Sequence, residues 1–80
     1  MSYFDYRASQ EIDGHDYPFY AIIMAAMRKA DTSNVEKLKS AFPATFLELQ
    51  ERYNLPLGMY QNEVIDGKTR KQHISELTHE

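Results

Sequence analysis

The feature that most limits what this chain can fold into is an apolar run from Tyr17 to Ala30, which carries no charge before Arg28. At 3.6 residues per turn, its aromatic, aliphatic and methionine side chains occupy almost the whole circumference of a helix. Such a helix must be covered by other helices or by a second copy of itself. The run therefore predicts a central core helix over about residues 17–30.

Helix signals before the run predict a short first helix over about residues 3–12. Ser2 and Asp5 have the spacing of a capping box at its start. Gly14 suits a left-handed C-terminal cap, and Asp16 stands where the core helix needs an N-cap. The acids of this loop are thus explained as capping residues.

Helix signals after the run predict two more short helices. Ser33 with Glu36 fits a second capping box, with Thr32 as the alternative cap. Pro43 suits the first turn of the next helix, because it needs no N–H donor there. We therefore predict an all-α fold, a small bundle of three to four short helices around the central helix at about 17–30.

Beyond Gly58 the chain has few aliphatic anchors among its charges and amides. Asp66-Gly67 suits a tight hairpin turn with very short strands, and residues 69–77 fit a marginal helix equally well. We therefore predict a helical domain over residues 1–58 and a weakly structured tail over residues 59–80, either flexible or ordered by a partner.

The size and charge of the chain limit which kinds of protein it can be. A chain of eighty residues can bury only a small core, and without cysteine it has no disulfide bonds to stabilise it. A homo-oligomer, which would bury more surface, is therefore one hypothesis. The net charge of −3 argues against general nucleic-acid binding. The apolar run is too short to span a bilayer and lacks the basic flank of a signal peptide, which indicates a cytoplasmic protein without membrane association.

The residues that could carry chemistry form no convincing site. Asp13, His15 and Asp16 could ligate a metal ion, but helix capping explains both acids. His73 and His79 are six residues apart, which does not place them on one helical face. No nucleophile elbow or phosphate-binding loop is present. We therefore expect no enzyme activity, no catalytic, cofactor-binding or metal-binding residues, and no cofactor.

The first twenty residues are rich in aromatic side chains, and two interpretations remain open. In the first, Phe4, Phe19 and Tyr20 pack in the core, and the tyrosine hydroxyls lie at its polar boundary. In the second, tyrosines anchor a protein interface, where Tyr and Arg are enriched. The candidate protein interface comprises Tyr3, Tyr6, Arg7, Glu11, Asp13 and Asp16.

Basic residues are locally enriched in one part of the sequence, which comprises Arg28, Lys29, Lys37 and Lys39. A solvated helix face is the simpler interpretation, because nucleic-acid modules usually carry a more strongly basic stripe. The alternative function that this face would serve is that of a small helical nucleic-acid-binding or transcription-related accessory protein.

The run 16–31, which Asn34, Leu38 and the segments 41–43, 48–49 and 52–53 continue and Ser-Gln-Glu-Ile at 9–12 precedes, resembles a family of short, functionally uncharacterised helical proteins encoded by bacteriophages and prophages. The resemblance covers about residues 3–58 and carries no catalytic residues. It implies a setting in the cytoplasm of a bacterial host, where small acidic helical phage proteins block host machinery, including defence systems such as CRISPR effectors.

Together these observations predict a non-enzymatic protein-interaction module. Its partner would be a host or phage protein. The expected mode of action is inhibition of a host protein complex, of the anti-defence or anti-CRISPR type.

Overall fold

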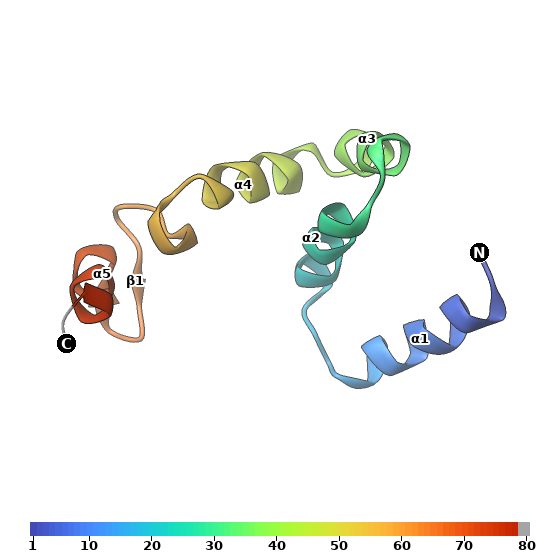
Figure 1. Cartoon of the computed structure of the whole chain (residues 1–80), viewed down its shortest axis with the longest axis horizontal. Coiled ribbons are helices and arrows are strands. Elements are labelled where there is room, and N and C mark those ends of the chain that lie inside the picture. The colour runs from blue at the N-terminus through green and yellow to red at the C-terminus, as the bar shows by residue number, and fades with distance from the viewer. Residues whose placement is uncertain (79–80) are drawn as a thin grey trace. The chain divides into compact units, whose positions relative to one another are not determined.

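A computed structural model describes residues 1–78 of the chain (Figure 1). Helices dominate these residues, and the one sheet among them has two strands of two residues each. The predicted all-α class is confirmed. The elements in chain order are α1 (Tyr3–Gly14), α2 (Phe19–Lys29), α3 (Thr32–Ala41), α4 (Pro43–Tyr53), the 3-10 turn η1 (Pro56–Gly58), β1 (Val64–Ile65), β2 (Lys68–Thr69) and α5 (Arg70–Thr78).

Internal contacts divide the chain into an N-terminal unit, Met1–Ala41, and a C-terminal unit, Phe42–Glu80. The division falls at the helix break that Pro43 predicts, and it does not coincide with the predicted domain boundary after Gly58. Residues 59–78 form the hairpin and α5, whereas residues 79–80 of the predicted tail, with His79, lie outside the described residues. That the tail is flexible or ordered by a partner stays a prediction.

The start of α1 is the predicted capping box. The Ser2 Oγ accepts a hydrogen bond from the Asp5 backbone N–H at 3.3 Å, and the Asp5 carboxylate accepts one from the Ser2 N–H at 2.9 Å. The helix runs two residues beyond its predicted end and includes Gly14. The predicted left-handed cap at Gly14 is wrong, because the left-handed conformation falls on Asp16, whose φ is 56°.

The central helix is shorter than predicted, since α2 begins at Phe19 and ends at Lys29. Its N-cap position is Pro18, without a side-chain capping bond, so the prediction that Asp16 caps this helix is wrong. With its positive φ, Asp16 instead turns the chain between α1 and α2. Arg28 and Lys29 lie in the last turn, as predicted, where cations complement the helix dipole.

The helix α3 packs against α2 in the N-terminal unit. Its cap is Asp31, whose Oδ1 accepts a hydrogen bond from the Asn34 N–H at 2.8 Å. The predicted caps Ser33 and Thr32 are therefore wrong, because the chain turns into the helix one residue before Thr32. Met27 on α2 is buried, with 5% of its surface exposed.

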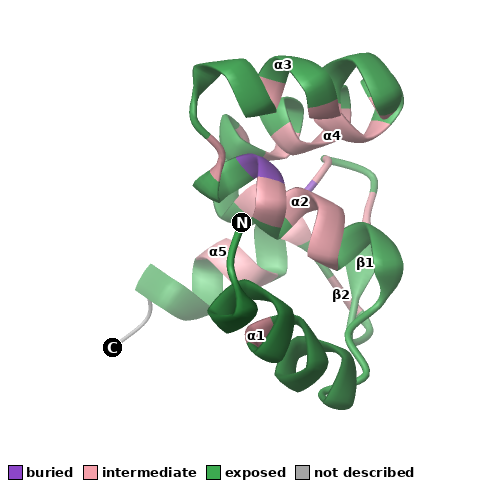
Figure 2. Ribbon diagram, turned by 90° about the vertical axis from the view of Figure 1, so that its right-hand side faces the viewer, coloured by how far each residue is buried: buried purple, intermediate pink, exposed green. Residues whose placement is uncertain are grey.

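The neighbours of α2 cover only part of its circumference, and most of the N-terminal unit is exposed (Figure 2). Phe4, Phe19 and Tyr20 have exposed fractions of 77%, 59% and 58%. Their predicted place in the core is therefore wrong. The prediction failed because α1 and α3 are too short to enclose so many rings, and the aromatic content of the sequence does not show this.

The C-terminal unit joins α4 to a hairpin and α5 through η1. Pro43 occupies the first turn of α4, as predicted. β1 pairs antiparallel with β2, with Val64 opposite Thr69, and Asp66 and Gly67 both have positive φ, as a tight two-residue turn requires. The hairpin turn and the helix after it, which the sequence left as alternatives, both form.

Candidate interaction surfaces

One face of α1 carries Tyr3, Tyr6 and Arg7. The centroids of the two tyrosine rings are 6.4 Å apart, and the side chains are 74% and 59% exposed. Arg7 follows Tyr3 by four residues and therefore lies on the same side of the helix. The structure thus brings together the aromatic and basic part of the predicted interface, although its role stays a prediction.

The acidic part of the predicted interface lies at the end of α1 and in the turn after it. Glu11, Asp13 and Asp16 are all exposed. The Asp13 carbonyl oxygen accepts a hydrogen bond from the Asp16 N–H at 3.1 Å, which closes the turn. Residues 1–16 hold four side-chain carboxylates and one guanidinium, so negative side-chain charge predominates in this segment.

His15 lies between these acids, and its ring contacts Tyr17 with the centroids 5.6 Å apart. Within the part of the chain that the structure describes, no group of three or more His, Cys, Asp or Glu side chains could hold a metal ion. Asp13, His15 and Asp16 lie in an acidic turn, and the His15 ring is tilted by 31° from that of Tyr17.

A groove between α2 and the end of α1 is a surface that the sequence did not predict. It has a volume of about 550 Å³ and is open to solvent. Sequence reasoning missed it because the whole circumference of the central helix was expected to be covered. The pattern that could have indicated it is the set of small residues spaced along one side of α2. The groove is lined by Ile12, Tyr17, Ala21, Ile22, Ala25, Ala26 and Lys29.

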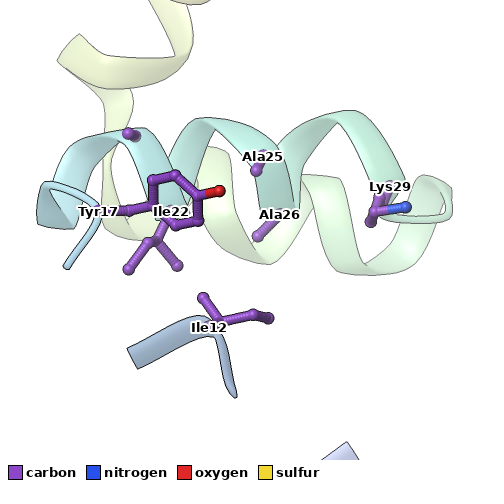
Figure 3. Close-up of a pocket in the computed structure, with 7 residues that line it drawn as sticks. Ile12, Tyr17, Ile22, Ala25, Ala26 and Lys29 are labelled. Carbon is purple, nitrogen blue, oxygen red and sulfur yellow. The ribbon is translucent and has the colours of Figure 1, made fainter. Parts of the chain in front are cut away.

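Large and small side chains occupy different parts of this groove (Figure 3). Tyr17 and Ile22 lie at one end, where Ile12 of α1 faces them. Ala25 and Ala26 leave the middle shallow, and Lys29 closes the other end. By helical spacing, this side of α2 is opposite the side that carries the buried Met27.

The predicted basic face is divided between two helices. Arg28 and Lys29 end α2, and Lys37 and Lys39 lie in α3, with all four side chains exposed. Arg28 and Lys29 lie in the last turn of α2, where they complement the helix dipole. The basic residues of α3 are accompanied by two acids, Glu36 in the helix and Asp31 at its cap. The structure therefore adds no observation that favours nucleic-acid binding.

The most connected polar side chain described in the C-terminal unit is Arg52 of α4. Its Nη1 and Nη2 atoms donate to the two carboxylate oxygens of Glu63 at 2.8 and 2.7 Å, and its Nε donates to Glu48 at 2.9 Å. Nη1 also donates to the Gly58 carbonyl oxygen at 2.9 Å, and the guanidinium lies 4.5 Å from the centroid of the Tyr60 ring. The only part of this cluster visible in the sequence was the i, i+4 spacing of Glu48 and Arg52.

The charges in this cluster stabilise one another. Hydrogen bonds from Arg52 and from the Tyr60 N–H lower the pKa of Glu63 to about 2. The bonds to Glu63 and Glu48 raise the pKa of Arg52, and burial raises the pKa of Tyr60. Because most of its donors are already engaged, Arg52 stabilises the C-terminal unit and is a poor candidate for binding an external anion.

Comparison with known proteins identifies no relative: no protein-family model, no curated protein and no solved structure matches the chain. Among residues 1–78, no helix has both the length and the apolar character needed to cross a membrane. The exposed surfaces of the chain itself are therefore the guide to its function.

Proposed function

We propose that the protein is a non-enzymatic protein-interaction module that binds a host or phage protein through the face of α1 that carries Tyr3, Tyr6 and Arg7. The observation that carries the proposal is the exposure of Tyr3 and Tyr6 as neighbouring rings on one helix. Tyrosine offers a large rigid contact area with a polar tip, and with arginine it is a frequent anchor of protein interfaces.

The acidic edge beside these rings defines the chemistry of the partner. Glu11 and Asp13 on α1 and Asp16 after it are exposed and would face a basic rim around an apolar pocket. Tyr3 and Tyr6 would fill the pocket, and the carboxylates would set orientation and association rate.

The proposed setting is the cytoplasm of a bacterial host, with the protein encoded by a phage or prophage and acting as an inhibitor of a host complex. The support for this setting is the resemblance of residues 3–58 to short phage-encoded helical proteins. A defence complex that binds nucleic acid is a fitting target, because such complexes expose basic surfaces that an acidic face could cover.

Affinity capture with the full chain tests the surface. A Tyr6→Ser/Arg7→Ser variant should lose a host protein that the unsubstituted chain retains, while helicity measured by circular dichroism stays the same. Tyr53→Ser in α4 removes another exposed tyrosine and should retain the partner. Equal retention by all three proteins would contradict the proposed surface, and salt-sensitive retention of DNA or RNA would favour the nucleic-acid alternative.

An infection assay tests the proposed setting. Expression of the protein in bacteria that carry an active defence system should restore plaque formation by a susceptible phage, and the Tyr6→Ser/Arg7→Ser variant should not. If plaque formation stays suppressed across a panel of defence systems, the anti-defence role is wrong, although the interaction surface could still serve another complex.

A further inference from the structure

Residues 59–78 of the C-terminal unit, which we call the arm, are held together by contacts of their own. β1 pairs with β2, and α5 packs against β2. His73 of α5 donates a hydrogen bond from Nε2 to the Ile65 carbonyl oxygen at 2.8 Å, and Lys68 forms an ion pair with Glu76. The hairpin and the helix of the arm are therefore joined without any contribution from α4.

The arm is connected to α4 through η1. Both α5 and α4 pack against this three-residue turn. Among the side-chain hydrogen bonds described for residues 1–78, those that reach from α4 to η1 and the arm come from Arg52, which donates to the Gly58 carbonyl oxygen and to both carboxylate oxygens of Glu63. One turn and one arginine are thus the main described links between α4 and the arm.

The backbone of η1 is strained in this position. Leu57 has a φ of 57° and a ψ of 14°, which lie in the left-handed region that residues with a Cβ atom disfavour. Its side chain is 49% exposed, so packing offsets only part of the cost. A few loop residues that absorb a large change in backbone angles are the usual form of a hinge, and here the strain is relieved when the turn opens.

We propose that η1 is a hinge and that the bonds of Arg52 to Gly58 and Glu63 hold the arm against α4. When these bonds break, Leu57 relaxes and the arm moves as one body, because its internal contacts do not involve Arg52. Opening also frees the donors of Arg52, so the position of the arm decides whether this cation is available to another molecule. This conformational device goes beyond the proposed function, which uses α1.

Distances between pairs of spin labels on the full chain test the hinge, and because the chain has no cysteine each label can be placed at one chosen position. Gln50→Cys on α4 with Ser75→Cys on α5 reports the position of the arm on α4, and both positions are exposed. Val64→Cys on β1, also exposed, with Ser75→Cys reports the arm itself. In the otherwise unsubstituted chain, each pair should give one narrow distribution of distances.

Arg52→Ala removes the bonds that hold the arm. The population with longer Gln50–Ser75 distances should rise by at least about tenfold, while the Val64–Ser75 distribution stays narrow. Lys71→Ala, which removes an exposed cation of α5, is the matched control and should change neither pair. An unchanged Gln50–Ser75 distribution in Arg52→Ala would overturn the proposal.

A milder variant decides the result if both pairs broaden in Arg52→Ala, as they would in an unfolded unit. Glu63→Gln removes one charge and keeps the bonds of Arg52 to Gly58 and Glu48. It should raise the population of longer Gln50–Ser75 distances by about 2- to 5-fold and leave the pair within the arm narrow. Broadening of both pairs in Glu63→Gln, or of neither, would show that the arm does not move about η1 as one body.

Discussion

The two units of the chain have similar length and different means of stabilisation. In the N-terminal unit, described polar contacts such as the Ser2–Asp5 box and the Asp31 cap join residues three positions apart. In the C-terminal unit, Arg52 joins α4 to Glu63, eleven residues further along the chain. The first unit relies on apolar packing between helices, and the second has a charged side chain at its centre.

This difference indicates where each unit can interact. The Arg52 cluster pairs most of its own donors and charges, and it gives the C-terminal unit internal order. The N-terminal unit buries Met27 and exposes Phe19 and Tyr20. The C-terminal unit also exposes Tyr53 and Leu77, so exposure alone does not distinguish the units, and we expect binding to depend on the N-terminal unit because the rings of Tyr3 and Tyr6 lie next to each other there.

The largest effect should come from a charge at the centre of the N-terminal unit. Met27→Asp should unfold it, because an unpaired buried charge costs about 3–5 kcal/mol, a large share of the stability of a small domain. Loss of the α1–α3 resonances in an NMR spectrum would show this. Met27→Leu is the control and should keep them. A folded Met27→Asp variant would mean that apolar packing does not hold this unit.

The next largest effect should come from Arg52→Ala. The variant loses every hydrogen bond to Glu63, Glu48 and the Gly58 carbonyl oxygen, so hydrogen-exchange protection in the hairpin and α5 should fall by at least about tenfold. Lys71→Ala changes an exposed cation of α5 and should leave protection unchanged. Equal protection in both variants would show that the cluster is not what orders this unit.

Acid should weaken the C-terminal unit through Glu63. The pKa of this carboxyl is about 2 in the folded chain, against an ordinary value of 4.5, so its contribution is complete above about pH 4.5 and is lost as the pH falls toward 2. Thermal unfolding of this unit between pH 6 and 2 should show the loss, and Glu63→Gln should flatten the profile. Glu36→Gln in α3 serves as the control. A profile that Glu63→Gln does not change would contradict this assignment.

The smallest effect should distinguish two candidate caps of α3. Asp31→Ala removes the bond to the Asn34 N–H and should cost about 1 kcal/mol of unfolding free energy. Ser33→Ala, at the position that the sequence favoured, should change stability by less than about 0.5 kcal/mol. Denaturant titration of both variants measures the difference. A larger loss of unfolding free energy for Ser33→Ala than for Asp31→Ala would instead identify Ser33 as the cap.

Local sequence signals predicted the elements well. The Ser2–Asp5 box, Pro43 at the start of α4 and the Asp66-Gly67 turn depend on residues close in sequence, and each appears as expected. Local signals predicted the wrong residue where two candidate capping positions lay within a few residues of each other. Asp16 resembled an N-cap, but the left-handed backbone there moved the start of α2 to Phe19.

Contacts between residues far apart in the sequence could not be predicted, because they depend on the path of the chain between them. The pairing of Arg52 with Glu63 depends on how η1 reverses the chain, where Leu57 and Gly58 both have positive φ. No periodicity in the sequence specifies that reversal. The groove was missed for a related reason, since the pattern of α2 shows which side chains are apolar but not how many neighbours are available to cover them.

The position of Ile12 and Tyr3 on opposite sides of α1 separates two surfaces of the N-terminal unit. Ile12 faces the groove beside α2, and Tyr3 lies half a turn away on the helix. A substitution at Ile12 therefore leaves the face of Tyr3 unchanged, and a substitution at Tyr3 leaves the groove unchanged. Binding at either surface can thus be abolished without altering the other.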